Sequence, residues 1–316
     1  MMQPTLARCD PAWYLPADLP EQITALESPV QGGLGVGAPG KVGLLEVGLA
    51  PHHGVTRVEH QYQRAPLHIY QPIYLDPGQP GMAFIFTQQS GDGFVQGDRY
   101  RVDIDCAPGS AAHITTQAAT KVYTARQNFV TQLVNLRAGA GAVLEYLPDP
   151  VVPFRGSRLF QRTCVTADPD STVMLSETLL PGRVAHGEAH AYDLYWAETE
   201  VRRPDGTLLF ADVLRLHPAA GDDPKSIGLL GSYDILATLC IVTNQMDPTA
   251  LVSLMRSALA ACPAILAGAT ELPHGCGAAV RLLGTSSTAV QAALRSAWNA
   301  ARLQLLGAPA PNLRKG

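Results

Sequence analysis

The sequence predicts a mainly β fold whose strands stack as the coils of a solenoid, with two α-helices at the C-terminal end. Three observations lead to this prediction. Apolar and polar residues alternate in short runs from about residue 42 to 247, as in half-buried strands. Three strand–turn–strand stretches follow one another at intervals of about 30 residues. After residue 247 the apolar residues recur at the spacing of amphipathic helices.

The composition excludes several classes of protein. The chain has 316 residues, 47% of them hydrophobic and 16% charged, which argues against disorder. A net charge of −4 argues against nucleic acid as a partner. The most apolar stretch, residues 227–242, is short and contains Asp234, so no membrane partner is expected. The N-terminus lacks a signal-peptide pattern and the six cysteines form no C-x-x-C pair, which indicates a cytoplasmic chain.

The first 40 residues are rich in proline and glycine. We predict a poorly ordered N-terminal extension over residues 1–40, with one short helix near residues 19–26. The segment GVGAPGKV (35–42) resembles a phosphate loop, but Val42 stands where the loop needs a hydroxyl for Mg²⁺. It also follows no apolar strand, so a flexible linker is the expected structure.

The strand pattern is clearest in residues 99–106, where apolar and charged side chains alternate. The three similar stretches are residues 102–117, 133–148 and 163–178, each with a turn-forming segment in the middle. Equivalent residues of stacked coils lie about 4.8 Å apart. We therefore expect side chains that follow their turns at similar intervals to form a polar row through the stack: Thr115, Glu145 and Glu177. The alternative is that these are exposed strand residues.

The C-terminal part predicts two helices, at about 248–261 and 286–306, with a strand at 278–284 between them. Ser286 or Ser287 suits the N-cap of the second helix, and Gly307 suits its end. No nucleophile motif is present. His186 and His190 could approach a metal from one strand face, but a site usually needs a third ligand. No tight metal site is therefore predicted.

Four segments between residues 91 and 188 resemble the UreD family of urease accessory proteins, also called UreH. The family patterns are G-G-x-x-x-G-D, L-T-T-x-A-x-T-K-x-Y, L-E-W-L-P and G-R-x-x-x-G-E. They match here around residues 91–98, 114–123, 144–148 and 182–188, with Asp92 in place of a glycine and Tyr146 in place of tryptophan. The matched positions that we assign to structure are Gly97, Lys121, Tyr123, Pro148, Arg183 and Glu188.

The resemblance implies a fold and a role. It implies a β-solenoid-like stack of two sheets with two C-terminal helices over residues 41–316. It implies a scaffold that is not an enzyme and that bridges the urease apoprotein to the complex of UreF with the GTPase UreG. Ni²⁺ would pass through the protein on its way to urease. It would be bound only transiently, with no tightly held cofactor.

A nickel path calls for several weak, wet oxygen ligands, because a closed site would trap the ion. The residues that we expect to line it are Asp98, Thr115, Thr116, Glu145, Asp149 and Glu177. Lys121 and Arg183 are expected to pair with these acids.

Three alternatives stay open at this point. The protein could be a structural adaptor without an ion path. It could also be a hydrolase that uses carboxylates with His186 and His190. Trp298, in the second C-terminal helix, could belong to a docking face for UreF or to the core.

Overall fold

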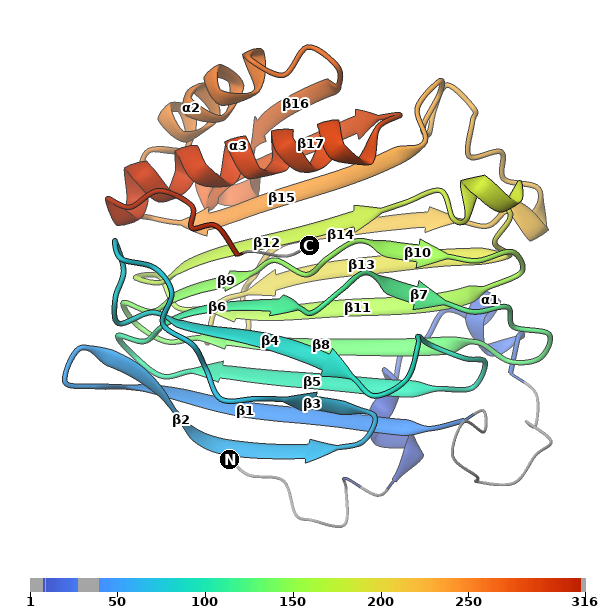
Figure 1. Cartoon of the computed structure of the whole chain (residues 1–316), viewed down its shortest axis with the longest axis horizontal. Helices are drawn as coiled ribbons and strands as arrows, with labels where there is room; N and C mark the ends of the chain where they lie inside the picture. The colour runs from blue at the N-terminus through green and yellow to red at the C-terminus, as the bar shows by residue number, and fades with distance from the viewer. Residues whose placement is uncertain (1–7, 9, 28–39, 314–316) are drawn as a thin grey trace.

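Two β-sheets face each other and form the body of the molecule (Figure 1). The computed structural model describes residues 8, 10–27 and 40–313. Within these residues, sheet A has seven strands in the order β14-β13-β11-β8-β5-β1-β2, and sheet B has ten strands. The strands of sheet A are β1 (Val42–His52), β2 (Val55–Arg64), β5 (Arg99–Cys106), β8 (Val130–Ala138), β11 (Arg158–Ala167), β13 (Leu194–Arg202) and β14 (Leu208–Leu216). Those of sheet B are β3 (Leu67–Ile69), β4 (Ala83–Gln89), β6 (Ala111–Thr116), β7 (Thr120–Val122), β9 (Val143–Tyr146), β10 (Val151–Pro153), β12 (Thr172–Leu179), β15 (Ile235–Thr243), β16 (Leu266–Glu271) and β17 (Gly277–Gly284).

The chain alternates between the two sheets, and successive coils pair in parallel. In sheet A, Val102 lies beside Val134, and Val134 lies beside Thr163. In sheet B, β4, β6, β9 and β12 follow one another in the same way. The prediction of a β-solenoid-like stack of two sheets is therefore confirmed.

Tight turns connect the sheets at one end of each coil. Gly109 and Gly141 occupy equivalent turns with φ of 72° and 65°, a region that favours glycine because it has no Cβ. The Ser110 hydroxyl donates to the carbonyl of Ala107 at 2.7 Å, closing the turn after β5. The three similar stretches of the sequence are thus successive coils of the stack.

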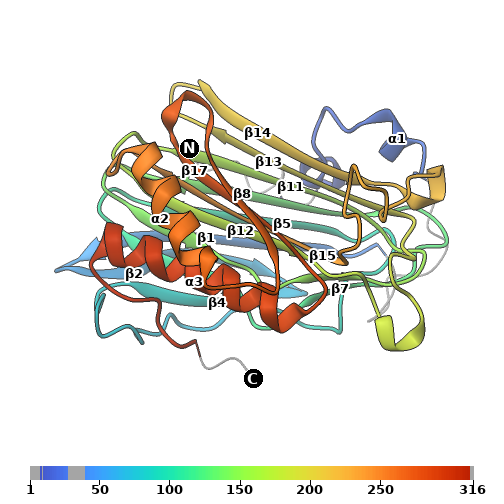
Figure 2. The ribbon, with the colours of Figure 1, turned by 90° about the horizontal axis from the view of Figure 1, so that it is seen from above.

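Helices α2 (Pro248–Ala260) and α3 (Ser287–Leu306) cover the outer face of sheet B (Figures 1 and 2). Their apolar residues, such as Met255 and Ala297, pack with Leu239 and Ile241 of β15. Ser286 caps α3 by accepting the N–H of Ala289, and Gly307 ends the helix with φ of 65°. The two predicted helices and the strand between them are confirmed.

Several strands were not predicted individually, among them the long strands β13 and β15. In β15, Cys240 and Val242 face the core between the sheets, while Leu239 and Ile241 face the helices. A strand covered on both faces is apolar at nearly every position and loses the alternation that identifies a half-buried strand. Within the described residues, no helix has both the length and the apolar content needed to cross a membrane.

Part of the N-terminal segment lies against the outer face of sheet A. It contains a 3-10 helix (Pro11–Tyr14) and α1 (Glu21–Thr24), which falls inside the predicted range 19–26. Ile23 is buried against Phe129 and Phe160. Residues 1–7, 9 and 28–39, with most of the GVGAPGKV segment, lie outside the described residues. The low order expected for residues 1–40 stays a prediction.

Candidate functional site

Asp98, the first of the six residues predicted to bind nickel, lies in a buried corner just before β5. Its carboxylate accepts the N–H groups of Lys41 and Val95, at 2.9 and 3.0 Å, and the hydroxyl of Tyr100 at 2.5 Å. Burial raises the pKa of Asp98, and these hydrogen bonds act in the opposite direction. Gly97, with φ of 80°, makes the turn that brings Asp98 here. Through these hydrogen bonds, Asp98 holds the start of β5 in place.

Glu145 faces the outside of sheet B, beneath α3. In the sheet its neighbours are His113 on one side and Met174 on the other. On β12, Glu177 is an odd number of residues from Met174, so it points to the other face of sheet B, into the space between the sheets. The predicted polar row of Thr115, Glu145 and Glu177 is therefore wrong. Thr115 shares the outer face with Glu145, but Glu145 is in register with Met174, three residues before Glu177, and an odd offset moves a side chain to the other face.

A buried network of polar and charged groups surrounds Glu145. Its carboxylate contacts the ring nitrogen Nδ1 of His113 at 2.7 Å, and it accepts hydrogen bonds from Trp298 Nε1 and Arg302 Nη1, both at 3.1 Å. Arg302 also donates to Asp76, in the loop before β4. Trp298 is 5% exposed and the other four residues are 4% exposed or less, so Trp298 belongs to the core. The network fastens α3 to sheet B.

Thr115, Thr116 and Asp149 lie near the end of β6. The Thr116 hydroxyl donates to Asp149 Oδ2 at 3.2 Å and accepts the N–H of Asp149 at 2.9 Å. Thr115 and Asp149 line a surface pocket of about 330 Å³ next to α3. Thr116 instead lines a pocket of about 320 Å³ that also includes Gln132 and Tyr146, which we call the Thr116 pocket.

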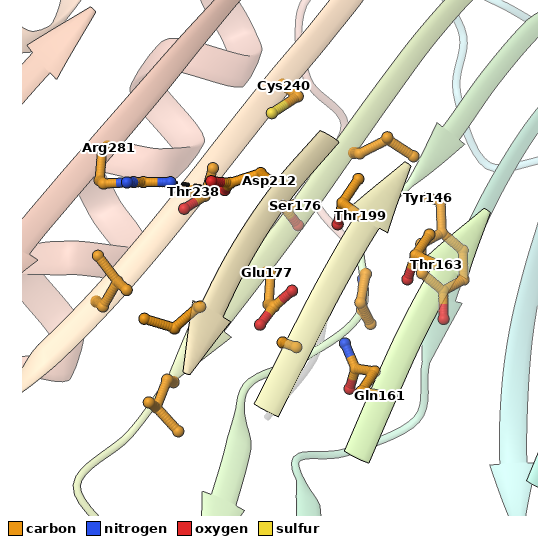
Figure 3. Close-up of a pocket in the computed structure, with 16 residues that line it drawn as sticks. Tyr146, Gln161, Thr163, Ser176, Glu177, Thr199, Asp212, Thr238, Cys240 and Arg281 are labelled. Atoms are coloured by element: carbon orange, nitrogen blue, oxygen red, sulfur yellow. Dashed lines mark hydrogen bonds and ion pairs between the residues drawn. The ribbon is translucent and has the colours of Figure 1, made fainter. Parts of the chain in front are cut away.

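Glu177 lies in a polar cavity between the sheets, which we call the inner cavity (Figure 3). The cavity has a volume of about 50 Å³, room for roughly three water molecules. Tyr195 donates its hydroxyl to Glu177 Oε1 at 2.5 Å. Burial raises the pKa of Glu177, although the bond from Tyr195 lowers it. The polar residues lining the cavity are Tyr146, Gln161, Thr163, Ser176, Glu177, Thr199, Asp212, Thr238, Cys240 and Arg281.

Most of these polar residues were missed in the sequence. Gln132 lies beside Gln161, and Thr163 beside Thr199, on neighbouring strands of sheet A. The signal that could have found them is the alternation of inward-facing and outward-facing positions along each strand. Each residue occupies a position whose neighbours two residues away, such as Val130 and Val165, belong to the core.

The inner cavity adjoins a hollow on each side. Tyr146 lines both the inner cavity and the Thr116 pocket. Four residues line both the inner cavity and a groove of about 630 Å³ beside β16, which we call the outer groove: Asp212, Thr238, Cys240 and Arg281. The Thr116 pocket and the outer groove therefore both border the inner cavity.

Several charged and aromatic residues of the matched motifs contact one another outside the inner cavity. Lys121 Nζ lies 2.6 Å from Asp92, which also accepts the hydroxyl of Tyr123 at 2.7 Å. Arg183 pairs with Glu188 at 2.7 Å. The expectation that Lys121 and Arg183 pair with the predicted nickel-binding acids is therefore wrong. Lys121, on β7, pairs instead with Asp92 in the loop before β5, and Arg183 pairs with Glu188 five residues further on. Separately, Pro148 lines the inner cavity.

His186 and His190 do not share a strand face. His186 ends a short 3-10 helix (Val184–His186), while His190 lies in the following loop with φ of 52°. His190 Nε2 is 3.5 Å from Asp234, and its burial lowers its pKa. Across residues 8, 10–27 and 40–313, no three His, Cys, Asp or Glu side chains come together in a way that could hold a metal ion.

A pH-dependent stability test follows from the burial of Glu177. Because its pKa is raised, folding favours the protonated carboxyl, so the stability it contributes is present at low pH and is lost as pH rises through the raised pKa. Glu177→Gln cannot ionise and still accepts the hydrogen bond from Tyr195. We expect this variant to be more stable than the unmodified protein at mildly alkaline pH and equally stable at acidic pH. Urea unfolding at both pH values measures the free energy of unfolding of each protein. A difference between the two proteins that is the same at both pH values would contradict the expectation.

Comparison with known proteins gives one consistent family. The family model described as UreD urease accessory protein matches residues 41–316, so the segment 8–27 lies outside the match. The "Urease accessory protein UreD 2" of Streptomyces griseus is 42% identical over 283 residues, which are 89% of this chain and 96% of that protein. The "Urease accessory protein UreD" of Haloarcula marismortui is 37% identical over 280 residues, 89% of this chain and 92% of that protein. The protein of the same name from Cenarchaeum symbiosum is 32% identical over 284 residues, 90% of this chain and 99% of that protein.

Proposed function

Because this chain belongs to the UreD urease accessory protein family, we propose that it delivers nickel to urease through the polar space between its two sheets. Family membership gives it a role in urease maturation. In the proposal it is a scaffold without catalytic activity that acts in the cytoplasm. It bridges the urease apoprotein to UreF and, through UreF, to UreG.

The observation that carries the proposal is Glu177 in the inner cavity. A carboxylate inside an otherwise apolar core is unfavourable unless it has partners or water. Here it has one strong hydrogen bond, from Tyr195, and space for a few water molecules. Hydroxyl and amide groups of Thr163, Gln161 and Thr199 line the rest of the cavity. Such a set offers weak oxygen ligands to a hydrated Ni²⁺.

The chemistry of the cavity favours passage over capture. Ni²⁺ binds thiolates tightly, and Cys240 lines the cavity. Burial raises the pKa of Cys240 to about 12, so its thiol stays protonated at neutral pH and is a poor ligand. A path with weak sites lets the ion leave again.

The proposed path includes two of the six residues predicted from the sequence. Glu177 lies in the inner cavity, and Thr116 lies in the adjoining pocket. The remaining four are assigned other roles: Asp98 holds the start of β5, Glu145 fastens α3, and Thr115 and Asp149 line the surface pocket.

Replacing Glu177 tests the proposal directly. We expect Glu177→Gln to leave copurification with UreF and urease intact, because the residue is internal. The nickel content of urease at limiting nickel should fall by about tenfold, since a neutral amide is a weak ligand for Ni²⁺. Nickel is measured by elemental analysis of urease purified from cells. Glu200→Gln, on the outer face of sheet A, serves as the control.

The outcomes separate the alternatives. Normal nickel with Glu177→Gln, together with intact copurification, would contradict the ion path and favour a plain adaptor. Turnover of an ester or amide substrate by the isolated protein would favour the hydrolase. The positions of His186 and His190 argue against that hydrolase, because neither residue lines the inner cavity with Glu177.

A further inference from the structure

An ion pair crosses from one sheet to the other between the inner cavity and the outer groove. Arg281 Nη2, on β17 of sheet B, donates to Asp212 Oδ2, on β14 of sheet A, at 2.6 Å (Figure 3). Both residues line both hollows. β14 is the edge strand of sheet A, so the pair lies at the open end of the stack. It stands between the polar interior and the outside.

The pair can open easily. The side chains of Arg281 and Asp212 are 56% and 41% exposed. Ion pairs with this much exposure contribute little to stability, because solvent screens the charges and both side chains lose freedom. The outer groove offers space and solvent for the guanidinium when it leaves Asp212.

A line of oxygen ligands runs inward from the pair. Thr238 lies between Arg281 and Glu177, in register with both on neighbouring strands of sheet B. Two inter-strand spacings separate Arg281 from Glu177, about 10 Å. On sheet A, Asp212 is in register with Thr199 of the inner cavity. A cation released from Asp212 therefore meets hydroxyl groups before it reaches Glu177.

We propose that Asp212 and Arg281 form a gate between the outer groove and the inner cavity, opened by a divalent cation that takes the carboxylate of Asp212 from Arg281. This proposal rests on the proposed nickel path and adds the residues that control its mouth. No covalent bond changes. The guanidinium leaves the carboxylate, the metal ion replaces it, and the pair forms again when the ion moves on to Glu177.

The gate has a consequence for loading. While Arg281 is paired, Asp212 offers no free charge to a cation, and a displaced guanidinium repels a second dication. The gate therefore sets the nickel concentration at which loading begins and admits one ion at a time. It also favours cations that bind a carboxylate strongly enough to displace Arg281.

The test compares charge removal on the two sides of the pair. Full-length Arg281→Gln and Asp212→Asn are each coexpressed with urease, UreF and UreG, and urease nickel is measured over a range of nickel concentrations. We expect Arg281→Gln to lower the nickel concentration for half-maximal loading by about fivefold, the effect of one exposed ion pair. We expect Asp212→Asn to raise it by a similar factor.

Two further variants serve as controls. Arg202→Gln breaks a similarly exposed pair, with Glu200 on β13, and should leave loading unchanged. Arg281→Lys keeps the charge and should load nickel like the unmodified protein, so a shift in Arg281→Gln is assigned to the lost charge rather than to the changed side chain.

The possible results distinguish the gate from the path. The gate is supported if the nickel concentration for half-maximal loading falls in Arg281→Gln and rises in Asp212→Asn. If both variants shift this concentration in the same direction, or leave it unchanged, the gate is overturned. In that case the path still stands if Glu177→Gln lowers urease nickel. If Glu177→Gln has no effect either, the path and the gate are both overturned.

Discussion

Arg302→Met is expected to lower the free energy of unfolding by about 3–5 kcal/mol. The Arg302 guanidinium is fully buried and donates to Glu145 and Asp76. Removing it leaves two carboxylates without their cation beneath α3, and an uncompensated buried charge is strongly destabilising. Urea unfolding followed by circular dichroism measures the loss.

Arg295→Met is the matched control for this variant. Arg295 lies on the same helix, but its guanidinium donates to the carbonyl oxygens of Ala310 and Pro311 and lies 5.9 Å from the centre of the Trp298 ring, so its removal takes no cation from a buried carboxylate. Its loss should lower stability by no more than about 1 kcal/mol. Equal losses for the two variants would contradict the view that the Glu145 network fastens α3 to sheet B.

Thr163→Trp is expected to stop nickel transfer to urease almost completely while the complex with the partners still forms. Thr163 lines the inner cavity, and an indole is much larger than the cavity of about 50 Å³. Filling the cavity closes the proposed path. The overpacking should also lower the free energy of unfolding by about 1–3 kcal/mol, which leaves a folded protein if its stability is typical.

Thr166→Trp is the control for the block. Thr166 lies on the same strand, β11, but lines the open groove on the outer face of sheet A, which includes Arg101 and Asn135. This variant tests whether tryptophan on β11 harms the protein in general. Loading that survives Thr163→Trp in a folded, partner-bound protein would contradict a path through the inner cavity.

The fold was largely predictable from the sequence because its signals are local. Alternation in residues 99–106 identified β5, and the repeat of strand, turn and strand identified three coils. Capping residues placed α3 within one residue of its start, at Ser287. β15 escaped prediction because helices on one side and the core on the other bury both of its faces.

The candidate site was much less predictable. Glu145 and Glu177 look alike in the sequence, since each follows its turn by a similar interval. An offset of three residues in strand register puts Glu145 under α3 with Arg302, which is 157 positions away, and puts Glu177 in the inner cavity. The face on which a side chain lies depends on the register of strands far apart in the chain.

By itself the sequence determined the solenoid repeat, the two C-terminal helices and the family motifs, because propensity, turns and caps act between near neighbours. Only the tertiary structure decided which polar residues meet. Gln132, Gln161, Thr163 and Thr199 come together only when parallel coils stack in register, and Asp212 meets Arg281 only where the two sheets face each other. Burial and pairing of charges are properties of the packed sheets, so they cannot be determined from local sequence.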